Sequence, residues 1–122
     1  MIARHISRLL ASLAVGTLVA LAWPAPGARA DAPPSPSPTL IVIRNYAFMP
    51  ASITIKTGST VQWRNDDSVS HTATAADGTF DSKNLDRGQT YTFTFAKAGT
   101  YAYTCSYHPN MTGKIVVSDT GQ

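Results

Sequence analysis

The feature that most restricts how this chain can fold is a series of short segments in which apolar and polar residues alternate. The clearest is residues 90–95 (TYTFTF), and residues 52–56 and 60–64 show the same period of two. Successive side chains of a β-strand point to opposite faces, so this period is typical of half-buried strands. Clusters of Gly, Asn, Asp and Ser separate the segments at intervals of roughly ten residues, which favours an all-β sandwich or barrel.

Further strands are expected at residues 40–43, 70–75, 99–105 and 114–117. In the strand that ends at Cys105, the side chains of Tyr101, Tyr103 and Cys105 share one face. Two tyrosines beside the cysteine favour the buried face, so the thiol is expected to point into the sandwich at the end of its strand. The expected core partners are Ile53, Ile55, Val61, Trp63, Phe93 and Phe95.

Residues 1–30 have the three parts of a secretory signal peptide. Arg4, His5 and Arg8 give a positive start, residues 9–23 are apolar, and residues 28–30 (ARA) form a small-x-small cleavage pattern. The apolar run is too short for a membrane helix, which needs about twenty apolar residues. We therefore expect cleavage near residue 30 and an exported protein, periplasmic or secreted. An uncleaved N-terminal anchor is the alternative.

The charge of the chain changes once this segment is removed. The full sequence has a formal net charge of +3, whereas seven basic and seven acidic residues remain after residue 30. No basic patch argues for nucleic acid or anionic lipid as a partner. Residues 31–39 (DAPPSPSPT) are rich in Pro and Ser, so we expect an extended spacer there and one domain over residues 40–122.

A single cysteine, Cys105, is unusual in an exported protein, because no disulfide can form within the chain. The segment 105–113 (CSYHPNMTG) also contains His108 and Met111, and His71 is the only other histidine after residue 30. Two imidazoles and a thiolate, with a thioether as a weak axial ligand, make up a blue-copper site. The sequence thus predicts one type 1 copper held by His71, Cys105, His108 and Met111, which would also mask the thiol.

This ligand set suits both Cu(I) and Cu(II), which an electron carrier requires. Taken alone, Met111 would be core filler, His71 a strand-edge histidine and Cys105 a small buried hydrophobe. With both histidines used as ligands, none is left for a second copper or an open catalytic position, so we expect no enzyme activity. Copper delivery or storage is the main alternative to electron transfer, and a structural sandwich that binds a partner is a third.

Residues 45–50 (NYAFMP), 61–65 (VQWRN), 80–82 (FDS) and the segment from Cys105 to Gly113 are similar to the cupredoxins of the plastocyanin and amicyanin group. The two-residue gap between His108 and Met111, with Pro109 after the histidine, resembles amicyanin most. The resemblance implies an eight-stranded Greek-key β-sandwich with copper at one end. By position, His71 and His108 would bind it through nitrogen, Cys105 through sulfur and Met111 axially.

Two positions depart from the pattern of this group. Thr72 stands where many relatives place Asn, whose side chain ties the two ligand loops together. A threonine hydroxyl can make one hydrogen bond across the loops, so the redox potential and the rigidity around the site stay open. Thr104 stands where plastocyanins carry an aromatic residue that serves as a remote exit for electrons. The exposed edge of His108 is therefore expected to be the single exit.

Partners leave little trace in this sequence, because redox encounters are small and transient. Similarity to amicyanin suggests a periplasmic dehydrogenase as electron donor, and a cytochrome is the other candidate. We expect a monomer. Asp66 and Asp67, in the loop before His71, are interpreted as a solvated turn.

Overall fold

The computed structural model describes residues 12–23, 27 and 34–120. The expected cleavage pattern at residues 28–30 lies outside them. Residues 12–23 contain no regular secondary structure, and the described residues contain no helix long and apolar enough to cross a membrane. The chain divides into two units, Met1–Pro33 and Pro34–Gln122. All of the strands that the structure describes belong to the second unit.

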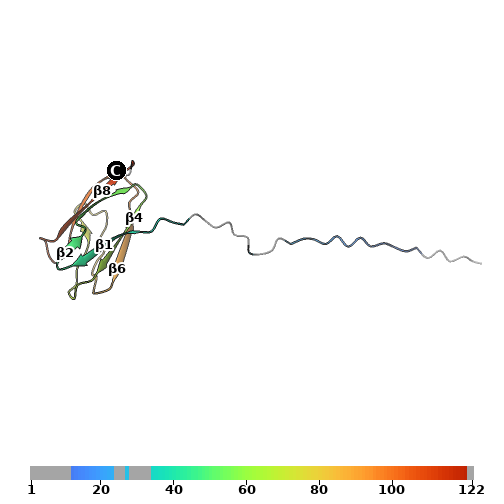
Figure 1. Cartoon of the computed structure of the whole chain (residues 1–122), viewed down its shortest axis with the longest axis horizontal. Coiled ribbons are helices and arrows are strands. Elements are labelled where there is room, and N and C mark those ends of the chain that lie inside the picture. Colours follow the sequence, from blue (N-terminus) through green and yellow to red (C-terminus); the bar gives the residue numbers. More distant parts are fainter. Residues whose placement is uncertain (1–11, 24–26, 28–33, 121–122) are drawn as a thin grey trace, which may run out of the picture. The chain divides into compact units, whose positions relative to one another are not determined.

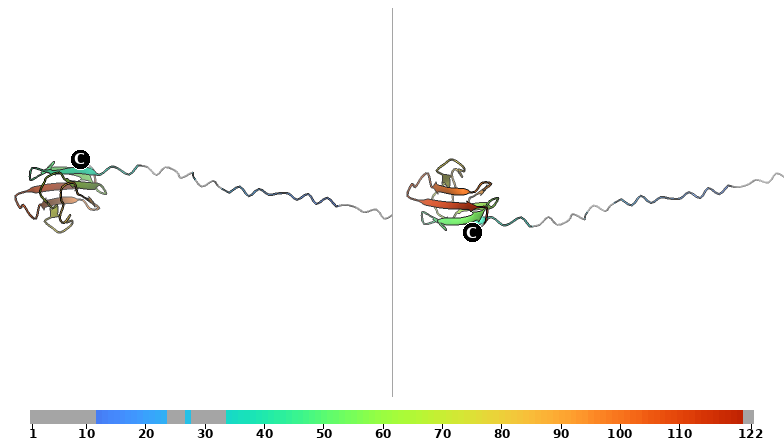
Figure 2. Two further views of the ribbon diagram at one scale, coloured as in Figure 1. Left: turned by 90° about the horizontal axis from the view of Figure 1, so that it is seen from below. Right: turned by 90° about the horizontal axis from the view of Figure 1, so that it is seen from above.

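The described residues form eight strands: β1 (Thr39–Arg44), β2 (Ala47–Met49), β3 (Ser52–Lys56), β4 (Thr60–Asn65), β5 (Thr74–Ala75), β6 (Thr90–Thr94), β7 (Gly99–Thr104) and β8 (Thr112–Ser118). They pair into two four-stranded sheets, with the orders β2-β1-β4-β6 and β3-β8-β7-β5 (Figure 1). The sheets pack face to face, as Figure 2 shows. Each sheet is mixed, because β1 runs parallel to β4 and β3 parallel to β8. The expected all-β sandwich is confirmed.

The core lies between the two sheets and follows the alternation of the sequence. In β4, the side chains of Val61, Trp63 and Asn65 are fully buried, whereas the residues between them are partly exposed. The Trp63 ring packs against the rings of Phe80, Tyr91 and Tyr103. All six expected core residues contribute: Ile55, Val61, Trp63 and Phe95 are buried, and Ile53 and Phe93 pack against the core while partly exposed.

The strand expected at residues 70–75 is only partly confirmed. Strand β5 contains Thr74 and Ala75 alone, and His71 forms an isolated bridge with Leu85. The backbone between these points donates to side chains instead of to a neighbouring strand: Thr72 N to Cys105 Sγ and Ala73 N to Ser82 Oγ. The segment is therefore extended without continuing the sheet.

The register of β7 and β8 places the segment 105–111 at one end of the sandwich. Thr104 pairs with Thr112 and Tyr103 with Gly113, so Cys105 and Met111 begin and end the connection between the two strands. Tyr103 and Cys105 are fully buried on the face that the alternation predicts. The loop that follows β4 carries His71, which lies within reach of Cys105.

Candidate metal centre

Three of the four expected ligands offer their donor atoms to one small space. The ligand atoms of His71, Cys105 and His108 all lie within 4.8 Å of one another. The distance from Cys105 Sγ is 3.8 Å to Nδ1 of His71 and 3.5 Å to Nδ1 of His108. His71 and Cys105 are completely buried, and His108 is partly exposed. One thiolate and two imidazoles gathered in this way fit copper by the chemistry of the donors.

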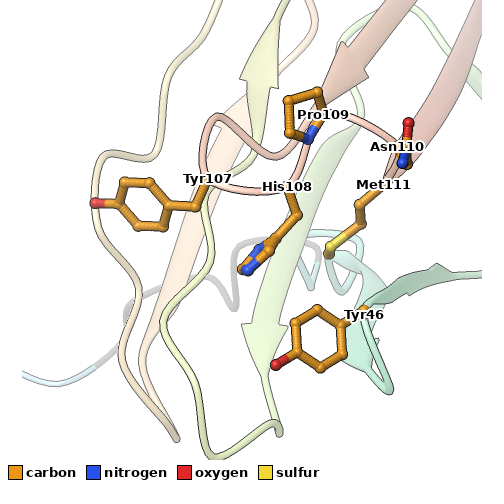
Figure 3. A pocket seen from close by; sticks show the side chains of 6 residues that line it. All are labelled: Tyr46, Tyr107, His108, Pro109, Asn110 and Met111. Atoms are coloured by element: carbon orange, nitrogen blue, oxygen red, sulfur yellow. The ribbon is translucent and has the colours of Figure 1, made fainter.

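Met111, the fourth expected ligand, is brought back toward the same space by the tight fold of the segment 105–111. Met111 N donates to His108 O over 2.9 Å, His108 N to Cys105 O over 3.2 Å, and Cys105 N to Met111 O over 3.0 Å. The Met111 side chain is 4% exposed. In Figure 3 its sulfur points to the side on which the His108 ring lies. The structure thus brings all four predicted residues to one end of the sandwich.

The orientation of His71 depends on Asp67, four residues earlier in the chain. Asp67 Oδ2 lies 2.8 Å from Nε2 of His71. Because a carboxylate only accepts hydrogen bonds, Nε2 carries the proton and the lone pair of Nδ1 is free to face Cys105. A carboxylate hydrogen-bonded to the outer nitrogen of an imidazole fixes the orientation of the ring and its tautomer.

Asp67 also holds a second segment of the chain. Its two carboxylate oxygens accept hydrogen bonds from the backbone N–H of Asn45, at 2.7 Å, and of Tyr46, at 3.0 Å. Burial raises the pKa of Asp67, but the hydrogen bonds from Tyr46, Asn45 and His71 outweigh this effect, so the pKa lies below its usual value. The Asp67 side chain is only 12% exposed. Its interpretation as part of a solvated turn is therefore wrong.

We expect Asp67→Asn to lower the free energy of unfolding of the metal-free protein by about 1 kcal/mol or more at neutral pH. An amide offers one acceptor where the carboxylate accepts three hydrogen bonds. A carboxyl whose pKa is lowered by folding stabilises the protein above its unfolded pKa of about 3.9, and this contribution is lost as the pH falls through the folded pKa. Urea unfolding at a series of pH values should show the difference between the two proteins shrinking below about pH 4.

The matched control for this variant is Asp66→Asn. Asp66 is paired with Arg64 and lies closer to the surface. Its replacement should leave the Nε2 proton of His71 where it is, whereas Asp67→Asn should shift the ¹⁵N resonances of the His71 ring. Identical ring spectra for the two variants would contradict the role of Asp67.

The Thr72 hydroxyl makes one hydrogen bond across the two ligand loops. Its Oγ1 accepts a hydrogen bond from Ser106 N over 2.8 Å. Thr74 extends the link, because its hydroxyl lies 3.0 Å from the hydroxyls of both Thr72 and Ser106. Thr72 N also donates to Cys105 Sγ over 3.3 Å. Threonine and serine hydroxyls thus link the two ligand loops, where the family resemblance implies an asparagine amide in many relatives.

His108 is reached from solvent through an open pocket of about 420 Å³. Figure 3 shows the pocket with Tyr46 and Tyr107 on either side of the His108 ring. Both tyrosines are about half exposed. The lining residues are Tyr46, Tyr107, His108, Pro109, Asn110 and Met111.

Comparisons with known proteins agree with this architecture. Residues 11–117 match the model of a family described as cupredoxin-like domain. Amicyanin from Paracoccus versutus is 33% identical over 97 residues, which cover 75% of this chain and 72% of amicyanin. A purple cupredoxin from Nitrosopumilus maritimus superposes with a TM-score of 0.62 at 34% identity, covering 66% of this chain and 99% of the other. A copper-containing nitrite reductase from Thermus scotoductus superposes with a TM-score of 0.65 at 32% identity over 69% of this chain, but this match spans only 23% of the reductase.

Proposed function

The chain belongs to the cupredoxin-like family, and on that basis we propose that it is a blue-copper electron carrier whose one copper is held by His71, Cys105, His108 and Met111. The observation that carries this proposal is the convergence of two imidazole Nδ1 atoms and one buried thiol within 4.8 Å. A bound copper would supply one-electron chemistry by alternating between Cu(I) and Cu(II).

The side chains around the site prepare it for this task before any metal binds. Asp67 keeps the proton of His71 on Nε2, and Thr72 N donates to the sulfur of Cys105. Because His71 and Cys105 are fully buried, only His108 offers an edge to solvent. Electrons would therefore enter and leave through His108, since Thr104 provides no aromatic alternative.

The proposal is tested by adding one equivalent of Cu(II) to the purified protein and recording optical and EPR spectra. We expect an intense visible sulfur-to-copper charge-transfer band and a small hyperfine splitting. A colourless Cu(II) complex would refute a type 1 site. Rapid electron self-exchange, together with failure to pass copper to an acceptor apoprotein, would separate electron transfer from copper delivery.

Electron transfer without catalysis is part of the same proposal. It is supported by the ligand inventory, because His71 and His108 are the two histidines after residue 30 and both are assigned to one site. The similarity to a nitrite reductase covers only a quarter of that enzyme and brings no activity to this chain. An assay of the copper-loaded protein for nitrite reduction should show no turnover.

We place the protein outside the cytoplasm, in the periplasm or secreted, after cleavage near residue 30. The composition of residues 1–30 supports this location. The partners would be redox proteins that bind transiently, such as a periplasmic dehydrogenase or a cytochrome. Mass spectrometry of the exported protein should find an N-terminus near residue 31.

Replacing Met111 should tune the potential rather than release the copper. Met111→Leu is expected to raise the reduction potential by about 60 mV or more, which corresponds to a tenfold change in the relative affinity for the two oxidation states. The reason is that removing a donor destabilises Cu(II) more than Cu(I). Met111→Gln should lower it, because an amide oxygen is a harder ligand. If voltammetry found the potential unchanged in both variants, Met111 would not be an axial ligand.

A further inference from the structure

The turn between β1 and β2 has a backbone conformation that one of its two residues, a tyrosine, normally avoids. It consists of two residues, Asn45 and Tyr46, and both have a positive φ, of 51° and 56°. Two-residue hairpin turns with this geometry favour Asn at the first position and Gly at the second. Asn45 follows the rule, whereas the β-carbon of Tyr46 is sterically disfavoured in this conformation. A violation of this kind points to a function for the side chain.

The turn is fixed to the candidate metal centre by a single carboxylate. Asp67 accepts hydrogen bonds from the backbone N–H groups of both turn residues, and the oxygen that accepts from Tyr46 N also accepts from Nε2 of His71. The position of the Tyr46 backbone is thereby tied to the position of the His71 ring.

The ring of Tyr46 contacts both imidazoles of the site. Its centroid lies 5.4 Å from that of His71 and 4.9 Å from that of His108, with interplanar angles of 88° in each case. Edge-to-face pairs at these separations are favourable. The two imidazoles are themselves 4.9 Å apart, so the three rings form one cluster. Tyr46 is 53% exposed, so its ring contacts the imidazoles and also meets solvent; Figure 3 shows it beside the His108 ring at the pocket.

We propose that Tyr46 is a positioning residue of the metal centre, whose ring holds the imidazoles of His71 and His108 in place and keeps water from that side of the site. In the strained turn conformation, which Asp67 holds through its hydrogen bond with Tyr46 N, the ring is directed at both histidines. The contact with the Tyr46 ring matters most for the orientation of the His108 imidazole, because His108 belongs to the short segment between β7 and β8 and is partly exposed. The proposal rests on the proposed function where it concerns the copper.

Three variants separate the effect of the Tyr46 ring from the effect of the positive φ in the turn. Tyr46→Gly removes the ring and suits a positive φ, so the thermal stability of the metal-free protein should be kept or raised. Tyr46→Phe retains the ring. Tyr107→Ala is the matched control, because Tyr107 is 52% exposed and lines the same pocket, while its hydroxyl is bonded to Asn84.

We expect the copper-loaded Tyr46→Gly protein to have a lower reduction potential than the wild type. Water that reaches the imidazoles stabilises Cu(II), which carries the higher charge, more than Cu(I). Tyr46→Phe and Tyr107→Ala should both stay at the wild-type potential in the same voltammetry experiment. An unchanged potential in Tyr46→Gly, or an equal fall in Tyr107→Ala, would overturn the proposal.

A second readout uses the metal-free protein and is independent of copper. In the wild type, NMR should show nuclear Overhauser effects from the Tyr46 ring protons to ring protons of both His71 and His108. In Tyr46→Gly the His108 ring signals should broaden or shift toward those of a free imidazole, with little change in Tyr107→Ala. Absence of the ring contacts in the wild type would refute the role of Tyr46, whereas absence of a blue colour with Cu(II) would refute the proposed function instead.

Discussion

Replacing Cys105 by Ser is expected to abolish the blue colour of the copper-loaded protein completely. The visible band of a type 1 site comes from charge transfer between the cysteine sulfur and copper, and a serine hydroxyl supplies no such sulfur. Cys105 is fully buried between the Nδ1 atoms of His71 and His108, so no other described side chain offers a thiolate there. Optical titration with Cu(II), followed by EPR, measures the loss.

The Ser variant should still fold, which makes the loss of colour interpretable. Serine is close to cysteine in size, and its hydroxyl can accept the hydrogen bond that Thr72 N donates to the sulfur. Circular dichroism of the metal-free variant should match that of the wild type. Colour that persisted in a correctly folded Ser variant would mean that the sulfur ligand is not Cys105.

Gly113→Ala is expected to lower the free energy of unfolding of the domain by about 3 kcal/mol. A β-carbon at this position would lie 2.2 Å from Cζ and 2.4 Å from the hydroxyl oxygen of Tyr103, the residue that pairs with Gly113 across β7 and β8. The Tyr103 ring is 1% exposed and is enclosed by Phe48, Trp63 and Phe80, so it cannot move aside. Urea unfolding of the metal-free protein measures the change.

Two further variants test whether the clash with Tyr103 is the cause. Thr112→Ala changes an exposed neighbour on the same strand and should cost far less. In a Tyr103→Leu background the added methyl group of Gly113→Ala should be tolerated better, because leucine lacks the atoms that collide. A double-mutant cycle should then show coupling between the two positions. Additive effects would mean that the loss has another origin, such as the conformation of the β8 backbone.

The β-sandwich could be predicted from the sequence because the information it needs is local. Alternation with a period of two is imposed by strand geometry wherever one face is buried, so the segments around Trp63 and Phe95 indicate both the strands and their buried sides. The end of β7 follows the same rule, and its alternation places Tyr103 and Cys105 on the core face. Strand β2 was not predicted as a strand, because its three residues are too few to show a period.

The four candidate ligands could also be predicted from the sequence alone. Cys105, His108 and Met111 lie on one short connection, so their proximity follows from chain length. His71 completes the set, because it is the only other histidine after residue 30. Soft and borderline donors in this combination have few uses besides copper.

How these residues are held in place cannot be predicted from local sequence patterns and follows from the tertiary packing. Asp67 contacts Asn45 and Tyr46, which lie more than twenty residues away in the chain, and no periodic pattern marks such a contact. Tyr46 could not be recognised as a neighbour of both histidines, because its direction is set by a turn conformation that a tyrosine normally avoids. Periodicity reports which face of a strand is buried, whereas hydrogen bonds between loops depend on where the strands end in space. Local sequence patterns are therefore enough to predict the sandwich and the candidate ligands, whereas the contacts that orient these side chains depend on how the loops pack.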